Sequence, residues 1–473
     1  MVPEIFVCAP VVAAITDDGV ENLSIDCTNV VAQGCIAFVN ATNSWVQNVR
    51  VINPSNKGIL MYQSMHITVR DSYLYGTQNA ASESYGTDNG FSSADNLEEN
   101  NIFQHIATPM MNEGEVCSVM AYNFLVDDFY NNNAPDWQQA SEYDHAAGNQ
   151  FLLNEGNEGI AATGDDIHGT ADFITYFRNY WHGQDPNGGS TGGKSQQTNA
   201  IQIEAYSRFY NIVGNVLGTA GYHNNYEVMP TSATDLGDAT TSNLSIYSFA
   251  YSGNQGTYGS PICLDPPTCT QYHSIDNDTV AYGTHMRWGN YDTRTLVTGC
   301  ASDCVNGVRF VSSEVPSGRS LGDPQYGNFV PPTQSLAASW FHSSQPTSWW
   351  STPWGTPPWP PIGPDVVNGS AYGMGANVLV SGFANDIPAA FCWFNTPIDS
   401  TYTTGSQTQA MNLTLTQSNT TVTATSNSPL PSSFSSTWPV NISGASVAGY
   451  NKNWRITSVV SQLILCNGAP CRG

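Results

Sequence analysis

The densest group of residues suited to acid–base chemistry is the segment GDDIHG, which contains Asp165, Asp166 and His168. Gly164 and Gly169 flank these side chains, a pattern typical of an exposed turn. Glycoside hydrolysis requires one protonated and one ionised carboxyl group, and crowding of like charges raises the pKa of a carboxyl group. We therefore predict that Asp165 and Asp166 are the catalytic acid and base of a glycoside hydrolase, and that His168 orients one of them.

The same segment is compatible with other roles. Aspartate and glycine are ordinary turn residues, so Asp165 and Asp166 could satisfy backbone N–H groups while His168 hydrogen-bonds a neighbouring stretch of chain. Paired acids also suit Ca²⁺, which prefers oxygen ligands, although the sequence specifies no metal site. A calcium-assisted polysaccharide lyase would need a basic residue as well, for which Arg208 is the first candidate and Arg178 the second. A third alternative is a cell-surface or adhesion protein that binds carbohydrate without catalysis.

Further acids, histidines and an aromatic residue surround this segment in ASEYDHAAG, ITYFRNYW, AIQIEAYSR and YHNNYE. We expect the following side chains to bind substrate: Asp144, His145, Arg178, Glu204, Tyr206, His223 and Glu227.

A recurring β pattern with a central Asn or Asp predicts the elements that position these residues. The central residues are Asn48, Asp71, Asn100, Asn123, Asn157, Asn179 and Asn215. Three of the six intervals between them are 22 or 23 residues long, and the longer ones contain Gly/Asn/Ser-rich stretches such as GQDPNGGSTGGKSQQ. This spacing predicts a parallel β-helix with about 22 residues per rung and loops inserted at one corner.

Asparagine suits such a repeat because it tolerates the left-handed conformation of a tight turn and can hydrogen-bond to the next rung. A β-sandwich is the alternative, and it would show turn signals every 8–12 residues or so.

Over roughly residues 15–230 the pattern resembles the pectate-lyase-like superfamily of right-handed parallel β-helices. Later segments, such as THMRWGNYDT and IPAAFCWFN, resemble parts of secreted bacterial β-helix proteins without an assigned activity. The DD and HG elements of GDDIHG are similar to those of polygalacturonase-type hydrolases, but that family's Asn-Thr-Asp and Arg-Ile-Lys motifs have no counterparts at matching positions. In the superfamily the Asn turn joins the second and third strands of a rung, and substrate lies along the first strand. The resemblance therefore implies that one groove is lined by Asp144, His145, Asp165, Asp166, His168, Glu204 and Arg208.

The sequence divides into a β-helix domain over residues 1–398 and a small β module over 399–473, where Thr, Val and Ser alternate in a way typical of a β-sandwich. Residues 230–398 are less periodic and rich in Pro and Trp. Their five clustered tryptophans would serve either for packing, which we favour, or as a sugar-stacking platform. These are Trp340, Trp349, Trp350, Trp354 and Trp359.

Composition limits the setting and the partners. Only 11% of the 473 residues are charged, and the formal net charge is −25, which disfavours nucleic acids, anionic membranes and polyuronates. No apolar run is long enough for a membrane helix, so we expect no insertion into membranes. We expect the protein to be a monomer whose partner is a polysaccharide.

Eleven cysteines include three close pairs, Cys263/Cys269, Cys300/Cys304 and Cys466/Cys471, which predict disulfides and an extracellular location. Cys117 and Cys392 are the candidates for a free, buried thiol.

Overall fold

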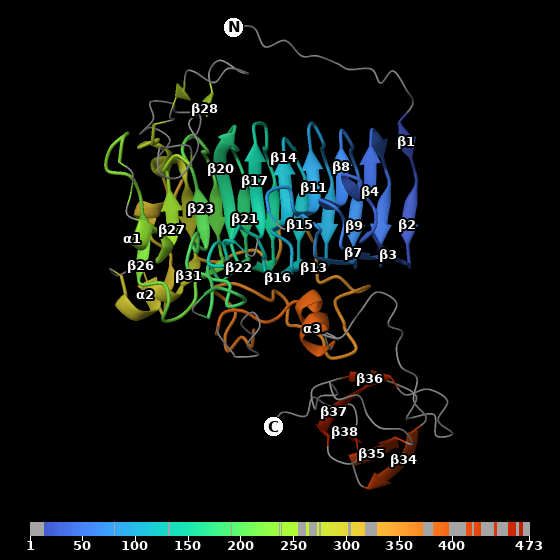
Figure 1. The fold of residues 1–473 in the computed structure, drawn as a ribbon. Coiled ribbons are helices and arrows are strands. Elements are labelled where there is room, and N and C mark those ends of the chain that lie inside the picture. Colours follow the sequence, from blue (N-terminus) through green and yellow to red (C-terminus); the bar gives the residue numbers. More distant parts are fainter. Residues whose placement is uncertain are drawn as a thin grey trace. The chain divides into compact units, whose positions relative to one another are not determined.

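Three long sheets of short parallel strands form the main body of the chain (Figure 1). In this computed structural model the chain passes from a strand of sheet I to one of sheet II and one of sheet III, and then returns to sheet I beside its previous strand. The chain is therefore a right-handed parallel β-helix, as the repeat predicts. The structure describes residues 14–79, 81–130, 133–190, 192–235, 237, 239–253, 262–263, 272–273, 276–300, 304–316, 329–371 and 382–396, and strands between 413 and 466.

The three sheets have the following strands. Sheet I consists of β4 (Gly34–Val39), β8 (Lys57–Tyr62), β11 (Tyr85–Gly90), β14 (Thr108–Glu113), β17 (Glu142–Ala146), β20 (Ala162–His168), β23 (Ile201–Ile203), β27 (Ser245–Phe249) and β26 (Asn225–Val228). Sheet II consists of β2 (Gly19–Glu21), β6 (Trp45–Gln47), β9 (Thr68–Arg70), β12 (Leu97–Glu99), β15 (Val119–Ala121), β18 (Leu153–Glu155), β21 (Thr175–Phe177), β24 (Asn211–Val213) and β30 (Met286–Trp288). Sheet III consists of β3 (Ser24–Asp26), β7 (Arg50–Ile52), β10 (Tyr73–Tyr75), β13 (Ile102–Gln104), β16 (Phe124–Val126), β19 (Glu158–Gly159), β22 (Tyr180–Trp181), β25 (Val216–Leu217), β31 (Asn290–Asp292), β33 (Val308–Arg309) and β32 (Cys304–Val305).

Several short elements lie outside these three sheets. β1 (Ile15–Thr16) pairs with β5 (Ala41–Thr42), and β28 (Ile262–Cys263) pairs with β29 (Tyr272–His273). The helices are α1 (Ala239–Asn243), α2 (Thr293–Thr298) and α3 (Pro388–Asn395), with 3-10 turns η1 (Ala281–Thr284) and η2 (Ser312–Glu314).

A ladder of buried asparagines runs along the turn between sheets II and III. Its members are Asn101, Asn123, Asn157, Asn179, Asn215 and Asn290. Each backbone N–H and side-chain amide donates to the side-chain oxygen of the next member, as between Asn123 and Asn157 at 2.9 and 3.1 Å. Hydrogen bonding along the ladder is thus present for the predicted members Asn123, Asn157, Asn179 and Asn215.

The first three predicted positions are displaced by one residue. Asn48, Asp71 and Asn100 precede the ladder position, and they hold the left-handed conformation with φ of 52–55°. In later rungs that conformation belongs to the residue before the ladder asparagine, for example Gly156 or Gly214. Asparagine therefore serves two purposes in this two-residue turn: it adopts the left-handed conformation at the first position, and it hydrogen-bonds along the ladder at the second. The sequence around one turn does not show which of the two positions an asparagine occupies.

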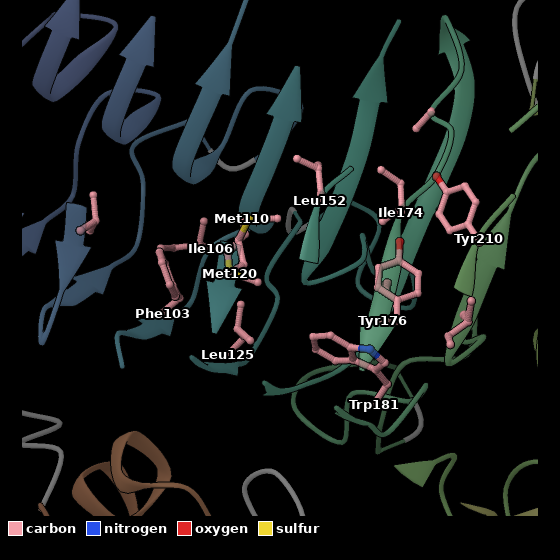
Figure 2. Close-up of a cluster of buried hydrophobic side chains, with 14 of the residues drawn as sticks. Phe103, Ile106, Met110, Met120, Leu125, Leu152, Ile174, Tyr176, Trp181 and Tyr210 are labelled. Carbon is pink, nitrogen blue, oxygen red and sulfur yellow. The ribbon is translucent and has the colours of Figure 1, made fainter. Parts of the chain in front are cut away.

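Apolar side chains fill much of the space enclosed by the three sheets. Figure 2 shows Phe103 and Leu125 of sheet III near Met110 of sheet I and Met120 of sheet II, all at most 1% exposed. Because side chains alternate along a strand, every second residue of each strand contributes to this interior. Stacking of rung on rung buries these side chains and is the main source of stability in such a repeat.

One stretch of the interior is polar and acidic. Its carboxyl groups, all at most 1% exposed, belong to Glu98, Glu115, Glu142 and Asp144. Their neighbours are amides and hydroxyls: Asn89 donates to Glu98 at 2.5 Å, and Asn112 donates to Glu142 at 3.0 Å and to Asp144 at 3.3 Å. We call these four residues the interior acids.

The chain forms two compact units. The first contains residues 1–345 and 358–389, and the second contains residues 346–357 and 390–473. The second unit has an antiparallel five-stranded sheet in the order β34 (Leu413–Ser418), β35 (Thr421–Ser426), β38 (Leu463–Cys466), β37 (Asn453–Val459) and β36 (Pro439–Asn441). The small C-terminal β module that the sequence predicts is therefore present, and the boundary at residue 398 stays a prediction.

Within the first unit, residues 329–345 and 358–371, which we call the Trp-rich segment, pack against the β-helix. Trp340 stacks on Phe177 with ring centroids 3.9 Å apart, and Trp359 contacts Tyr122. The Glu155 carboxylate accepts the backbone N–H groups of Trp340 and Phe341. These contacts agree with the packing interpretation of the cluster. In the second unit, Trp350 is buried at 1% exposure beside Trp349.

Two disulfides lie within the described residues. Cys300–Cys304 was predicted from its spacing, whereas Cys27–Cys35 was not. The predicted pairs Cys263/Cys269 and Cys466/Cys471 involve side chains outside the described part. Cys117 and Cys392 are free thiols, but Cys117 is exposed and Cys392 half-buried, so the expectation of burial is wrong for Cys117.

Candidate functional site

A row of acid and base side chains crosses the outer face of sheet I. Asn112, Asp144, Gly164 and Ile203 are paired across β14, β17, β20 and β23 and face the interior. The residue after each of them points outward, because successive side chains alternate between faces. These outward residues, which we call the acid–base row, are Glu113, His145, Asp165 and Glu204.

The acid–base row lies in a cavity of about 690 Å³ above sheet I. Glu113, His145 and Glu204 line it directly, whereas Asp165 lies beneath His145 at 0% exposure. Tyr85 and Tyr143 from the same sheet face add aromatic surface. Long loops inserted before the strands of sheet I supply the walls, at the corner where the sequence predicts insertions. Loop residues lining the cavity include Tyr130, Trp137, Gln139, Gln196, Gln197 and Asn243.

His145 and Asp165 form a hydrogen-bonded pair. His145 Nδ1 lies 2.5 Å from Asp165 Oδ2, and the side chain of His145 is 13% exposed. Burial lowers the pKa of His145, but the hydrogen bond and charge of Asp165 outweigh burial, and the pKa is raised above its usual value. The pair therefore has the arrangement of an orienting carboxylate and a general base, with the second ring nitrogen available for a proton.

Glu204 and Asp166 form a pair of crowded carboxyl groups. The backbone N–H of Asp166 donates to Glu204 Oε2 at 3.1 Å, and Gln202 donates to Glu204 Oε1 at 2.8 Å. Burial, followed by the charges of Asp166 and Asp165, raises the pKa of Glu204 well above its usual value. Burial also raises the pKa of Asp166. Glu204 is therefore suited to hold a proton at neutral pH and to donate it.

Glu113 occupies the other side of His145. Burial, followed by the charge of Asp88, raises the pKa of Glu113 to about 7. Asp88 forms an ion pair with Lys57 at 2.7 Å, and both side chains are largely buried. The charge of Glu113 also contributes to the raised pKa of His145, so the members of the row are electrostatically connected.

An irregularity in β20 gives this strand its unusual chemistry. His145 follows the pair Asp144–Gly164, but the next pairing joins Ala146 to His168, so β20 has additional residues at this point. The bulge places Asp166 beside Glu204 and moves His168 outward, where it is exposed on the cavity lining. The His168 ring lies 4.6 Å from the His145 ring, and burial, followed by the charge of His145, lowers the pKa of His168.

The structure brings five predicted residues together: His145, Asp165, Asp166, His168 and Glu204. The contacts differ from the expected ones, because His145 and not His168 hydrogen-bonds Asp165, and both aspartates are buried at 2% exposure or less. GDDIHG is a bulged strand end rather than a wholly exposed turn.

Asp144 does not lie in the groove that the sequence analysis assigned to it. It points into the β-helix, where Tyr176 and Tyr210 each donate to its carboxylate at 3.4 Å. The reason is strand alternation: residues next to each other in a strand point to opposite faces, so Asp144 and His145 cannot both line one groove.

The remaining predicted residues do not line the cavity. Arg208 and Tyr206 lie in the turn after β23, where Arg208 forms an ion pair with Asp278 at 2.7 Å. Arg178 is 1% exposed and binds Asp365, and so braces the Trp-rich segment.

His223 and Glu227 also have structural contacts. His223 is buried between the backbone groups of Thr219 and Thr198. Glu227 forms an ion pair with Arg287 at 2.6 Å.

Sequence reasoning missed Glu113 and the aromatic residues of the cavity. Glu113 lies before Asn123 much as Glu204 lies before Asn215, so counting back from one more ladder asparagine would have found it. Tyr130 and Trp137 have no such signal, because they lie in inserted loops whose path depends on distant contacts.

Two further findings concern metals and membranes. Within the described residues, no three His, Cys, Asp or Glu side chains are placed to hold a metal ion, so the acids predicted to suit Ca²⁺ do not converge on such a site. No helix in the described part is long and apolar enough to cross a membrane.

Comparison with known proteins gives no match, whether to protein-family models, to curated proteins or to solved structures.

Proposed function

We propose that this chain is a secreted glycoside hydrolase that cuts a polysaccharide in the cavity above sheet I. The observation that carries the proposal is the acid–base row, in which a proton donor, Glu204, and a general base, His145 with Asp165, line one cavity. Two disulfides support an extracellular location. The parallel β-helix and its Asn ladder support placement in the pectate-lyase-like superfamily.

The proposed reaction is a single displacement by water. His145 removes a proton from water, the resulting hydroxide attacks the anomeric carbon, the glycosidic C–O bond breaks, and Glu204 protonates the departing oxygen. Proton exchange with solvent then restores both groups. His145 and Glu204 belong to strands separated by β20. Because His145 activates water and does not itself attack the sugar, the reaction has one displacement, so we expect inversion at the anomeric carbon.

Asp165 and Asp166 act through their neighbours in this mechanism. Asp165 orients His145 and stabilises the imidazolium that forms. Burial and, after it, the charge of Asp166 keep Glu204 protonated. Hydrolysis is favoured over β-elimination because the candidate lyase base Arg208 lies outside the cavity lining, in an ion pair.

The test is release of reducing ends from a panel of polysaccharides, with NMR detection of the first anomer formed. We expect reducing ends, inverted product and no ultraviolet absorbance from unsaturated sugars. Glu204→Gln and His145→Ala should each reduce kcat by about 10²–10⁴-fold while leaving the circular dichroism spectrum unchanged. The matched control Glu21→Gln, at the exposed beginning of the β-helix, should retain full activity.

Each other outcome has a defined meaning. Unsaturated products would show a lyase and refute the proposal. Binding of glycans without turnover across the panel would indicate a carbohydrate-binding protein. Full activity in both Glu204→Gln and His145→Ala would remove the acid–base row from the mechanism.

A further inference from the structure

The cavity is lined by many side-chain amides and by a few acids. Six side-chain amides line it, belonging to Gln139, Gln196, Gln197, Asn199, Gln202 and Asn243. The lining acids are Glu83, Glu113 and Glu204, and among the described residues of the lining none is a lysine or arginine. Amides recognise hydroxyl groups through paired donors and acceptors, whereas recognition of carboxylates relies on cations.

Lys57, whose ammonium group lies over the ring of the lining residue Tyr85, cannot serve a carboxylate ligand without breaking a buried ion pair. Lys57 is bound to Asp88 at 2.7 Å, and their side chains are 11% and 1% exposed. Using Lys57 for a ligand would leave the Asp88 carboxylate buried without its charge partner, which is strongly unfavourable. Among the described lining residues only the imidazoles of His145 and His168 can carry a positive charge, and His145 is already paired with Asp165. An anionic sugar in this cavity would therefore meet three acids and no lysine or arginine.

An aromatic pair forms part of the wall. The rings of Tyr130 and Trp137 meet at an angle of 63° with centroids 4.3 Å apart, and both residues line the cavity while half-buried. Aromatic carbon surface packs against the C–H face of a pyranose as against other apolar surfaces, and the interaction needs no charge on the sugar.

Backbone hydrogen bonds hold the Trp137 side of this pair in place. Trp137 forms a bridge with Gln196, and the Asp136 carbonyl accepts the N–H groups of Ser195 and Gln196. Beneath them, Lys194 and Asp185 form a buried ion pair at 2.7 Å. Two loops far apart in the sequence therefore present Trp137 and Gln196 as one rigid wall, and a preformed wall costs less ordering entropy on binding.

From these observations we infer that the cavity takes an uncharged polysaccharide, with one sugar ring packed on the Tyr130–Trp137 pair and its hydroxyls bound by the wall amides. The inference rests on the proposed function for the nature of the ligand, but it specifies a neutral glycan instead of a polyuronate or an amine-bearing glycan.

The experiment measures binding and cleavage separately. Glu204→Gln, expected to be inactive, is titrated by calorimetry with hexamers of uncharged glucan, xylan and mannan, with oligogalacturonate, and with an amine-bearing glucosamine hexamer. We expect at least one uncharged hexamer to bind, with an affinity that is unchanged between low and high salt because no charge pairing is involved. Trp137→Ala should weaken this binding by about tenfold or more. The matched control Trp45→Ala, whose tryptophan contacts Glu21 at the far end of the β-helix, should have no effect.

The outcomes separate the inference from the proposed function. Binding of an uncharged hexamer that the wild-type chain does not hydrolyse would refute the hydrolase and leave the neutral-glycan site in place. Hydrolysis confined to the uronate or amine-bearing polymer would retain the hydrolase and overturn the inference. Equal affinity of Trp137→Ala and the parent variant would also overturn it, and absence of binding to every hexamer would refute both.

Discussion

The proton that His145 shares with Asp165 controls the proposed chemistry at the scale of single residues. His145 must be neutral to accept a proton from water, yet the carboxylate at 2.5 Å favours its charged form. Activity should therefore rise with pH as His145 loses its proton. It should fall again at high pH, when Glu204, whose pKa is raised by burial and by Asp166, can no longer donate one.

Replacement of Asp165 tests this electrostatic connection. In Asp165→Asn the burial of His145 is opposed only by the smaller effects of the Glu113 and Asp88 charges, so the pKa of His145 should decrease. The acidic limb of kcat/KM should move to lower pH, and kcat should decrease by about 10²-fold or more because the imidazolium loses its stabilising partner. The measurement is kcat/KM across pH 4–9.

Asp95→Asn is a suitable control, since Asp95 is an exposed aspartate in another turn of the same β-helix. Its profile should match that of the wild-type chain. An Asp165→Asn profile with an unmoved acidic limb would show that His145 is not the group titrating.

The ladder asparagines also act as individual residues. Asn157 accepts two hydrogen bonds from Asn123 and donates to the Met120 carbonyl and to Asn179. Asn157→Ala leaves several buried polar groups unpaired, so the free energy of unfolding should decrease by roughly 2–4 kcal/mol, measured by urea denaturation. Asn48→Gly, at a left-handed position with φ of 53°, should cost much less because glycine accepts that conformation. Equal losses in the two variants would contradict the distinction between ladder and turn residues.

At the scale of elements, the two loops that wall the cavity depend on one buried ion pair. Lys194 contacts Asp185 at 2.7 Å, with side chains only 3% and 0% exposed. Lys194→Met leaves the Asp185 carboxylate buried and uncompensated, a change that typically costs about 3–5 kcal/mol. We expect faster hydrogen exchange in residues 133–139 and 183–190 and weaker glycan binding, with the rest of the β-helix unaffected.

The double variant Lys194→Met/Asp185→Asn distinguishes charge from packing. It removes both charges and can keep the hydrogen bonds that Asp185 accepts from Asn187. Slow exchange should be largely restored. Exchange as fast as in the single variant would show that the Lys194 side chain matters for its contacts instead of its charge.

The elements were predictable from the sequence where a local rule acts repeatedly. Rung spacing located the ladder from Asn123 to Asn215, because each rung must stack on the previous one. Strand alternation could not be applied to Asp144 and His145, since the sequence does not indicate which of two neighbours points outward until the register is known. The Tyr130–Trp137 wall was not predictable, because it depends on contacts between loops about 50 residues apart in the sequence, such as Ser190 with Asp136.

At the scale of the whole molecule, the interior acids connect the stability of the β-helix with pH. Burial raises the pKa of Glu98 to about 7, of Glu115 to about 8 and of Asp144 to about 7. Their hydrogen-bond partners within the described residues are amides, hydroxyls and phenols, which do not neutralise a carboxylate. The folded chain therefore holds these groups as neutral acids at pH values where the unfolded chain releases their protons.

The sign of the effect follows from linkage. At the interior acids the folded state binds more protons than the unfolded state between about pH 4.5 and pH 8, so their contribution to the free energy of unfolding should decrease as pH rises through this range. Glu98 alone should contribute roughly 3 kcal/mol to the decrease. Urea denaturation at intervals from pH 4 to pH 9 measures it.

Single variants identify the origin of the pH dependence. Glu115→Gln removes one titrating group while retaining an oxygen that can accept from Asn96 and Ser118, so its stability should change less steeply with pH than that of the wild-type chain. Glu21→Gln, at an exposed position, should leave the slope unaltered. A wild-type stability that is constant or increases from pH 4.5 to pH 8 would show that the interior acids are ionised in the folded chain and that another group compensates their charge. With the interior acids protonated in the folded chain, two opposing requirements set the working pH of the protein. Deprotonation of His145 favours catalysis at higher pH, because the proposed mechanism requires a neutral His145. Protonation of the interior acids favours the folded state at lower pH.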